Sequence, residues 1–285
     1  MKLFRFGPVG QEQPGVLTPD GRSLDVAAFG QDYDETFFAT EGLGRLAAWL
    51  AAHAGACPAV PAGTRLGPCV ARPSKLVGIG LNYRQHSAET GLGTPTEPVF
   101  FLKATTALCG PHDEVVLPRG ATKLDYETEL ALVVGRRARY VPEREALSYV
   151  AGYCILNDYS ERAFQLERGG QWTKGKSADT FAPLGPYLVT PDEVPDPQAL
   201  PMWLTVNGET RQDSSTADML FQLPRLLSYV SEFMTLLPGD IISTGSPAGV
   251  GMGLHPPHYL QVGDVVRLGI GELGQQQQVV AAFNE

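Results

Sequence analysis

The chain has 285 residues and a formal net charge of −9, from 22 Lys and Arg against 31 Asp and Glu. This length predicts one large domain, or one main domain with a small appendage, and the apolar content is that of a folded protein. An acidic chain lacks the broad basic face that binds nucleic acids or anionic membranes. We therefore expect neither as a partner.

The chain carries no feature of a membrane-bound or secreted protein. No stretch approaches the roughly 18 apolar residues of a membrane span, and Gly7 and Pro8 interrupt the first apolar run. The sequence contains four cysteines, Cys57, Cys69, Cys109 and Cys154. No two of them have the close spacing of zinc or redox motifs. We expect reduced thiols and a cytoplasmic location.

The N-terminal part of the chain is interpreted as a small separate unit. Leucines at spacings of three and four predict a helix from Thr40 to Ala54. The segment from Cys57 to Pro73 is rich in Pro, Gly and Ala, and is interpreted as a linker. We therefore predict a small domain over residues 1–70 and a larger domain over residues 71–285.

The larger domain is predicted to be mostly β. Its 32 Gly and 23 Pro, counted over the whole chain, leave room for short elements only. Strands are expected at Lys75–Tyr83, PVFFLKA, Tyr126–Gly135, Gly152–Ser160, MWLTVNGE, DIISTG and DVVRLGI. The Asn207-Gly208 pair indicates a hairpin turn, and a helix is expected over Leu220–Phe233. Gly91, Gly93, Pro95 and Pro98 indicate a loop with freedom to move, and the Gln275–Gln278 run is assigned no function.

Two glutamates in one predicted strand indicate a metal site. Glu127 and Glu129 are two residues apart, so both side chains point to one side with Cα atoms roughly 6 to 7 Å apart. Asp158 ends the apolar run of another strand. Three carboxylates without Cys or His suit Mg²⁺ or Mn²⁺, and leave positions open for water or substrate. The alternative is a solvated edge strand, with Asp158 starting a turn.

The chain resembles the fumarylacetoacetate hydrolase superfamily. The resemblance runs from Gly78 to Ile270, and its segments, in order, are GIGLNYRQHSAE, DYETEL, LNDYSERAFQ, KGKSADTFAPLGP, VNGE, PGDIISTGSPAGVG and VGDVVRLGI. It implies an α+β, predominantly β protein with a mixed β-sandwich roll, usually a homodimer. It also implies that Glu127, Glu129 and Asp158 hold Mg²⁺ or Mn²⁺.

The resemblance also implies catalytic residues. His86 and Glu89 are three apart, which places them on one face if this segment becomes a helix on substrate binding. They match a His/Glu pair on a lid, in which the carboxylate orients the imidazole as a general base. Lys176 matches a lysine directed toward the metal-bound substrate. Lys174 is nearby, and we expect Lys176 to be the one that faces inward.

Further residues are expected to bind the substrate. Asn82, Tyr83 and the Thr244, Gly245, Ser246 turn would supply donors for a carboxylate or oxyanion. Arg162, Gln165 and Trp172 follow the metal aspartate and are expected to line the pocket, with a structural ion pair as the alternative for Arg162. Many members of the superfamily have Thr at the position of Ser246, so the hydroxyl is kept.

These residues together predict hydrolysis of a carbon–carbon bond. A 2,4-dioxo acid would chelate the metal through its C1 carboxylate and C2 oxygen, and water activated by His86 would add to C4. The chain resembles bacterial members that act on 2,4-diketo-3-deoxy sugar acids, often labelled ureidoglycolate lyase. The expected substrate is the fuconate or rhamnonate form, giving pyruvate and lactate. The alternatives are an oxo-acid decarboxylase or tautomerase, ureidoglycolate lyase, and a β module with a structural Ca²⁺ site.

Overall fold

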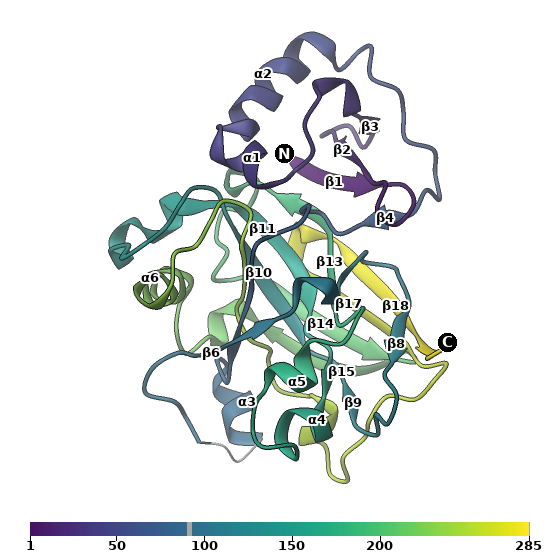
Figure 1. The fold of residues 1–285 in the computed structure, drawn as a ribbon, viewed down its shortest axis with the longest axis vertical. Coiled ribbons are helices and arrows are strands. Elements are labelled where there is room, and N and C mark those ends of the chain that lie inside the picture. The colour runs from purple at the N-terminus through teal and green to yellow at the C-terminus, as the bar shows by residue number, and fades with distance from the viewer. Residues whose placement is uncertain (90–92, 285) are drawn as a thin grey trace.

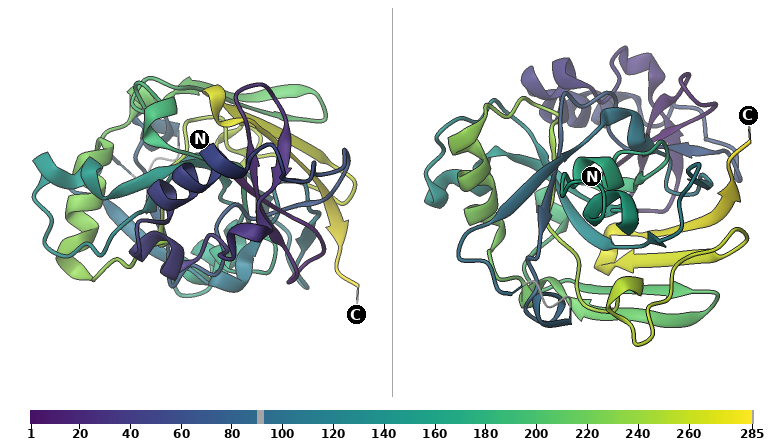
Figure 2. Two further views of the ribbon diagram at one scale, coloured as in Figure 1. Left: turned by 90° about the horizontal axis from the view of Figure 1, so that it is seen from above. Right: turned by 60° about the horizontal axis from the view of Figure 1, so that its bottom comes forward.

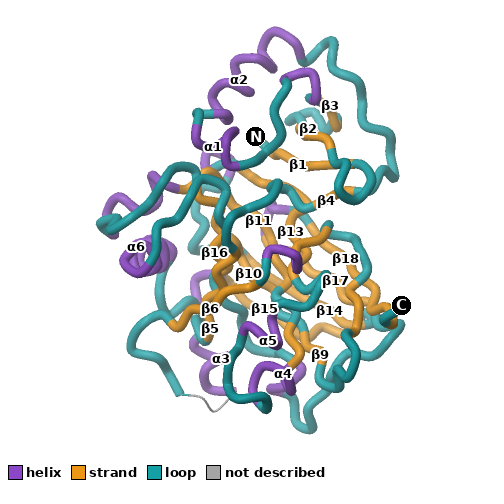
Figure 3. Tube along the Cα trace, viewed as in Figure 1, coloured by secondary structure: helices purple, strands orange, loops and turns teal. Residues whose placement is uncertain are grey.

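The computed structural model describes residues 1–89 and 93–284, and strands form its interior (Figures 1 and 3). The strands are β1 (Lys2–Phe6), β2 (Gln13–Leu17), β3 (Ser23–Asp25), β4 (Leu66–Gly67), β5 (Leu76–Gly80), β6 (Val99–Lys103), β7 (Leu108–Cys109), β8 (Val115–Leu117), β9 (Leu124–Asp125), β10 (Thr128–Val134), β11 (Val150–Asn157), β12 (Ser160–Glu161), β13 (Ala182–Val189), β14 (Pro201–Val206), β15 (Glu209–Ser215), β16 (Ile241–Ser243), β17 (Val265–Ile270) and β18 (Gln275–Ala282). The α-helices are α1 (Glu35–Ala39), α2 (Gly42–His53), α3 (Arg84–Glu89), α4 (Arg162–Leu166), α5 (Thr173–Lys176) and α6 (Leu223–Phe233).

Two sheets make up the main layers. The larger sheet has 11 strands, and its main path runs β3-β2-β1-β13-β11-β10-β16-β5-β6. The smaller has five strands in the order β15-β14-β17-β18-β8. The right-hand view of Figure 2 shows the yellow C-terminal strands beside the green hairpin of β14 and β15. Residues of β10 and β13 contact β14, β17 and β18, so the two sheets pack face to face as a sandwich.

The centre of the large sheet is buried on both faces. β10 pairs with β11 on one side and with β16 on the other, and every residue of β10 and β11 is buried. Strands covered in this way need apolar residues at almost every position. The apolar TELALVV and VAGYCILN segments meet this need, and a carboxylate among them is removed from bulk water.

The N-terminal unit lies at one end of the molecule, where α1 and α2 pack beside β1 to β4 (Figure 1). β1 pairs antiparallel with β13, so this unit extends the large sheet. The segment from Cys57 to Pro73, expected to be a linker, contributes β4, which pairs with β1. The domain boundary predicted after residue 70 stays a prediction.

Most of the expected elements are present. The mixed α+β, strand-rich architecture predicted from the sequence is confirmed. Asn207 and Gly208 both have positive φ, 52° and 84°, as a two-residue hairpin turn requires. The predicted loop starting at Gly91 begins outside the described residues, and residues 93–98 form neither helix nor strand.

Two further features concern the cysteines and the helices. All four cysteines are free thiols, and Cys69, Cys109 and Cys154 are buried. Within the described ranges, every helix is too short or too polar to cross a bilayer.

Candidate active site

Three buried carboxylates meet at the ends of two central strands. Glu129 lies in β10, Glu127 directly precedes that strand, and Asp158 directly follows β11. One oxygen from each lies within 4.8 Å of the others, and each residue is at most 5% exposed. The alternative of a solvated edge strand is therefore wrong, because β10 lies between two partner strands.

The chemistry of this triad fits a hard divalent cation. Burial raises the pKa of Glu129 well above its usual value, and the charges of Asp158 and Glu127 raise it further. Like charges in a buried site are unfavourable unless a cation compensates them. All three donors are oxygens, the ligands that Mg²⁺ and Mn²⁺ prefer. The residues that would hold such an ion are thus Glu127, Glu129 and Asp158.

Two buried lysines compensate part of this negative charge. Lys176 Nζ, in α5, lies 2.7 Å from Glu127 Oε2 and 2.6 Å from Asp158 Oδ2. Burial lowers the pKa of Lys176, but Asp158 and Glu127 outweigh it and the pKa ends above its usual value. Lys103, at the end of β6, donates to the other oxygen of Asp158. Lys174 is exposed, so Lys176 is the lysine of this pair that faces the site.

Arg162 is held between two acids. Its Nε donates to Asp125 Oδ2 at 2.8 Å, and a terminal nitrogen donates to Glu127 Oε1 at 2.7 Å. Burial would raise the pKa of Glu127, but Lys176 and Arg162 hold it far below its usual value. The other terminal nitrogen donates to Gln165 Oε1, so α4 presents both residues to the pocket. Arg162 therefore both forms a structural ion pair and lines the pocket.

The His86 and Glu89 pair is assembled on one helix. α3 is already formed, and His86 Nδ1 lies 2.8 Å from Glu89 Oε1. Glu89 also accepts the backbone N–H of Gly249 at 3.0 Å. A Cβ on Gly253 would lie 2.6 Å from the Glu89 carboxylate carbon, so that glycine permits the close approach. Glu89 thus docks α3 on the 249–253 segment, with His86 6% exposed beside the pocket.

The turn after β16 serves the triad and the pocket in different ways. Ser243 Oγ and the backbone N–H of Gly245 both donate to Glu129 Oε2, at 2.5 and 3.0 Å. Thr244 Oγ1 donates to the Leu130 carbonyl. Ser246 lines the pocket, and its Oγ accepts from Gln212. Of the three residues predicted in this turn, Ser246 lines the pocket. Thr244 and Gly245 instead hydrogen-bond to residues of β10.

Asn82 and Tyr83 lie away from the pocket lining. The Asn82 side chain donates to the Phe221 and Thr244 carbonyls and accepts the Phe221 N–H, and it is fully buried. The Tyr83 hydroxyl contacts Met202 Sδ at 3.1 Å in the core. In this structure the two side chains connect the loops around the site, and the substrate contacts expected of them stay predictions.

Several polar residues that support the triad were missed at the level of sequence. Among them are Lys103, Asp125, Asn157, Ser243 and Gln278. Lys103 lies two residues after Phe101, and Asp125 lies two residues before Glu127. In an extended chain each side chain therefore points to the same side as an inward residue, and this spacing is a signal that could have found them. Gln278 Oε1 accepts from Asn157 Nδ2, and Asn157 Oδ1 accepts the Glu127 backbone N–H. The glutamine run assigned no function thus supports a triad residue.

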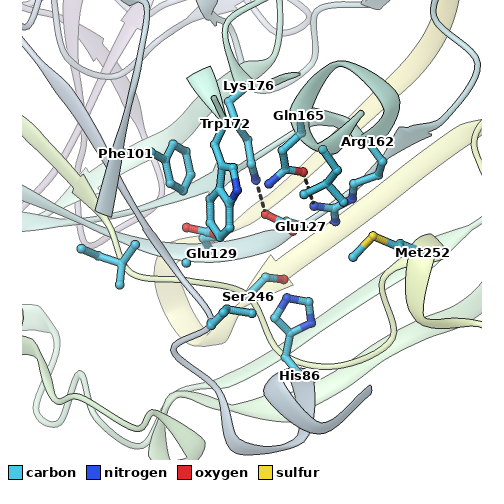
Figure 4. Close-up of a pocket in the computed structure, with 14 residues that line it drawn as sticks. His86, Phe101, Glu127, Glu129, Arg162, Gln165, Trp172, Lys176, Ser246 and Met252 are labelled. Carbon is cyan, nitrogen blue, oxygen red and sulfur yellow. Dashed lines mark hydrogen bonds and ion pairs between the residues drawn. The ribbon is translucent and has the colours of Figure 1, made fainter. Parts of the chain in front are cut away.

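One pocket collects most of these groups (Figure 4). Its polar lining consists of His86, Glu127, Glu129, Arg162, Gln165, Lys176 and Ser246. Its remaining lining is Gly80 with the apolar residues Ile79, Leu81, Phe101, Leu166, Trp172 and Met252. Carboxylates for a cation, a histidine oriented by an acid and two cationic side chains therefore face one space. This arrangement is suited to acid–base chemistry on a metal-bound anion.

Comparison with known proteins identifies the family. The profile of the fumarylacetoacetate hydrolase C-terminal domain matches residues 75–281. The chain belongs to the fumarylacetoacetate hydrolase family. A relative from Burkholderia multivorans, described in general terms as a hydrolase, is 51% identical over 283 residues, covering 99% of each chain.

Solved members of the fumarylacetoacetate hydrolase family share the whole architecture. The fumarylacetoacetate hydrolase of Exiguobacterium antarcticum has a TM-score of 0.85 and 36% identity, covering 99% of this chain and 100% of its own. Maleylpyruvate hydrolase of Sphingobium sp. SYK-6, solved with manganese(II) and pyruvate, has a TM-score of 0.82 and 31% identity, covering both chains fully. A 2-hydroxyhepta-2,4-diene-1,7-dioate isomerase of Mycobacterium marinum has a TM-score of 0.75 and 30% identity, again over both chains. The family thus includes hydrolases and isomerases.

Proposed function

We propose that this protein is a Mg²⁺- or Mn²⁺-dependent hydrolase that cleaves the C3–C4 bond of a 2,4-dioxo acid, giving pyruvate and a second carboxylic acid. The observation that carries the proposal is one pocket lined by Glu127, Glu129, Lys176 and His86. Asp158 completes the buried triad behind this lining, and Glu89 contacts the histidine from outside it. The manganese and pyruvate bound to the Sphingobium relative support the choice of cofactor and product.

The head of the substrate would lie at the triad. When bound, the metal ion would supply a Lewis acid for the substrate carboxylate and the C2 oxygen. Lys176 Nζ, within 2.7 Å of two triad carboxylates, is placed to donate to the same oxygens. Arg162 and Gln165 hold one side of this space and orient the substrate.

The histidine would activate water. Glu89 holds His86 Nδ1, so that Nε2 takes the proton from the attacking water. The water oxygen bonds to C4, and the C3–C4 bond breaks with its electron pair delocalised onto C3 and the C2 oxygen. The proton then reaches C3, which gives pyruvate, while C4 leaves as the carboxyl of the second acid.

Within this class we propose a 2,4-diketo-3-deoxy sugar acid as the substrate. The fuconate or rhamnonate form would give pyruvate and lactate. Its hydroxylated end is short and uncharged, and the polar groups at the pocket include Gln165 and Ser246, which are suited to contact a hydroxyl.

The test is pyruvate release from a panel of 2,4-dioxo acids, measured with Mg²⁺, with Mn²⁺ and with a chelator. We expect turnover with either metal and none with the chelator. His86→Ala should lose about 100-fold or more in kcat while retaining metal binding, since a general base contributes this much. His53→Ala is the control, because His53 is exposed on α2 and stacks on Trp49.

Other outcomes identify the alternatives. Carbon dioxide release from oxaloacetate, at a rate equal to or above the cleavage of dioxo acids, would show a decarboxylase. If Glu129→Gln lowers the melting temperature and no dioxo acid is ever consumed, the site is structural. Hydrolysis that persists in His86→Ala would remove the proposed base.

A further inference from the structure

We infer that the pocket accepts 2,4-dioxo acids whose end beyond C4 is uncharged, and that it discriminates against those with a second carboxylate there. This inference rests on the proposed function, because it assigns the head of the substrate to the triad. It adds a substrate class, the monocarboxylic dioxo acids, and it is drawn from the charges and side chains of the pocket wall.

Apolar side chains form part of the wall outside the triad. Phe101 and Trp172 pack with ring centroids 5.7 Å apart, and Figure 4 shows both rings on one side of the pocket with Met252 on another. Trp172 lies against β5, where a Cβ on Gly80 would come within 2.4 Å of its ring. Leu166 is 39% exposed beside the opening. A neutral substrate end gains from contact with these apolar side chains, whereas a carboxylate placed against them loses water.

Both permanent cations of the lining are already paired with acids. Arg162 contacts Asp125 and Glu127, and Lys176 contacts Glu127 and Asp158. Over residues 1–89 and 93–284, the pocket lining contains no other lysine or arginine. Recognition of a second carboxylate commonly uses an arginine or lysine that can form a bidentate or charge-assisted bond. The proposed function already assigns Lys176 and Arg162 to the head of the substrate, so neither serves a second carboxylate at its other end.

The charges around the site point the same way. Four buried carboxylates (Asp125, Glu127, Glu129 and Asp158) face three cations (Lys103, Arg162 and Lys176), and Glu89 adds a further acid beside His86. A divalent ion would compensate this excess of negative charge together with the head of the substrate. A second substrate carboxylate would add negative charge to a site whose acids already outnumber its cations.

The experiment compares two substrates that differ at one end only. C7 is a methyl group in 2,4-dioxoheptanoate and a carboxylate in 2,4-dioxoheptanedioate. With Mg²⁺ present, we expect kcat/KM for pyruvate release to be about 100-fold lower for the dioate. Calorimetry with the His86→Ala variant gives the dissociation constants of both compounds without turnover, and the same order is expected there.

A charge-gain variant tests the cause. Leu166→Arg places a cation at the opening and should improve kcat/KM for the dioate at least about 10-fold relative to the heptanoate. Leu166→Gln adds a polar group without charge and should keep the preference for the heptanoate. A circular dichroism spectrum and melting curve check that each variant is folded.

The outcomes separate the two hypotheses. Equal or better cleavage of the dioate by the unmodified enzyme overturns this inference and leaves the proposed hydrolase intact. If neither these compounds nor any dioxo acid of the panel releases pyruvate, the proposed function fails, and the calorimetric preference still decides whether the pocket discriminates by charge. Equal binding of both compounds, or binding of neither, overturns the inference.

Discussion

Replacing Lys176 with methionine should destabilise the protein without metal and make metal binding more stabilising. The lysine ammonium lies 2.7 Å from a Glu127 oxygen and 2.6 Å from an Asp158 oxygen, and the side chain is 2% exposed. Methionine keeps much of the length and apolar volume but removes the charge. Glu127 and Asp158 then keep Arg162 and Lys103, respectively, as cationic partners.

The size of the effect follows from the burial of these groups. Removing one partner of a buried ion pair costs about 3 to 5 kcal/mol. We expect the lower end, about 3 kcal/mol, because the remaining lysine and arginine still contact the same acids. For a chain of this size, about 2 to 4 °C is lost per kcal/mol, so the melting temperature in a chelator should fall by about 6 to 12 °C.

A bound divalent ion should recover much of that loss. The ion would supply the positive charge that the lysine no longer provides, and no ammonium would repel it. The rise in melting temperature on adding saturating Mg²⁺ should therefore be larger for Lys176→Met than for the unmodified protein. Differential scanning calorimetry with chelator and with Mg²⁺ measures both quantities.

A neighbouring lysine provides the control. Lys174 lies on the same short helix, is exposed, and donates to the Arg168 carbonyl. Lys174→Met should change stability by no more than about 0.5 kcal/mol and leave the Mg²⁺ effect unchanged. The reasoning is refuted if Lys176→Met is as stable as the control variant in the chelator, or if Mg²⁺ stabilises both to the same extent.

Three further predictions concern the surroundings of the triad. The raised pKa of Glu129 means that the metal-free folded state holds a proton that the unfolded state has lost. The free energy of unfolding in a chelator should therefore fall as the pH rises above about 4.3, the ordinary pKa of glutamate. Glu129→Gln should flatten this part of the stability–pH profile, and a profile that rises there contradicts the assignment. Asn82→Ala should lower the free energy of unfolding by about 2 to 3 kcal/mol, because it leaves buried backbone groups unpaired, and should leave KM unchanged in steady-state kinetics. A raised KM with unchanged stability would instead indicate substrate contact. Gln278→Leu removes the hydrogen bond that orients Asn157, whose Oδ1 accepts the Glu127 backbone N–H. The variant should therefore bind Mg²⁺ about 10-fold more weakly in calorimetry. Unchanged affinity would show that this support is dispensable.

Local pattern predicted most strands and placed the two glutamates on one side of the chain, whereas the family resemblance was needed to interpret them with Asp158 as a metal site. Two glutamates at a spacing of two within an apolar segment share a side of the chain whatever its neighbours are, because side chains alternate along a strand. An apolar run ending in Asp158 similarly places a carboxylate at the end of a buried strand. The expected homodimer and the residue boundary after position 70 stay predictions.

Which partner each remaining polar side chain hydrogen-bonds to depended on packing between segments that are distant in sequence. Asn82 pairs with the Thr244 carbonyl 162 residues away, and Gln278 reaches Asn157 across 121 residues. A local motif identifies a polar residue but does not say whether its hydrogen bonds go to a ligand or to another loop, since either partner satisfies the same donor. The partner is determined when the two sheets pack together, because a buried polar group must pair with the backbone or side chain that the fold places beside it.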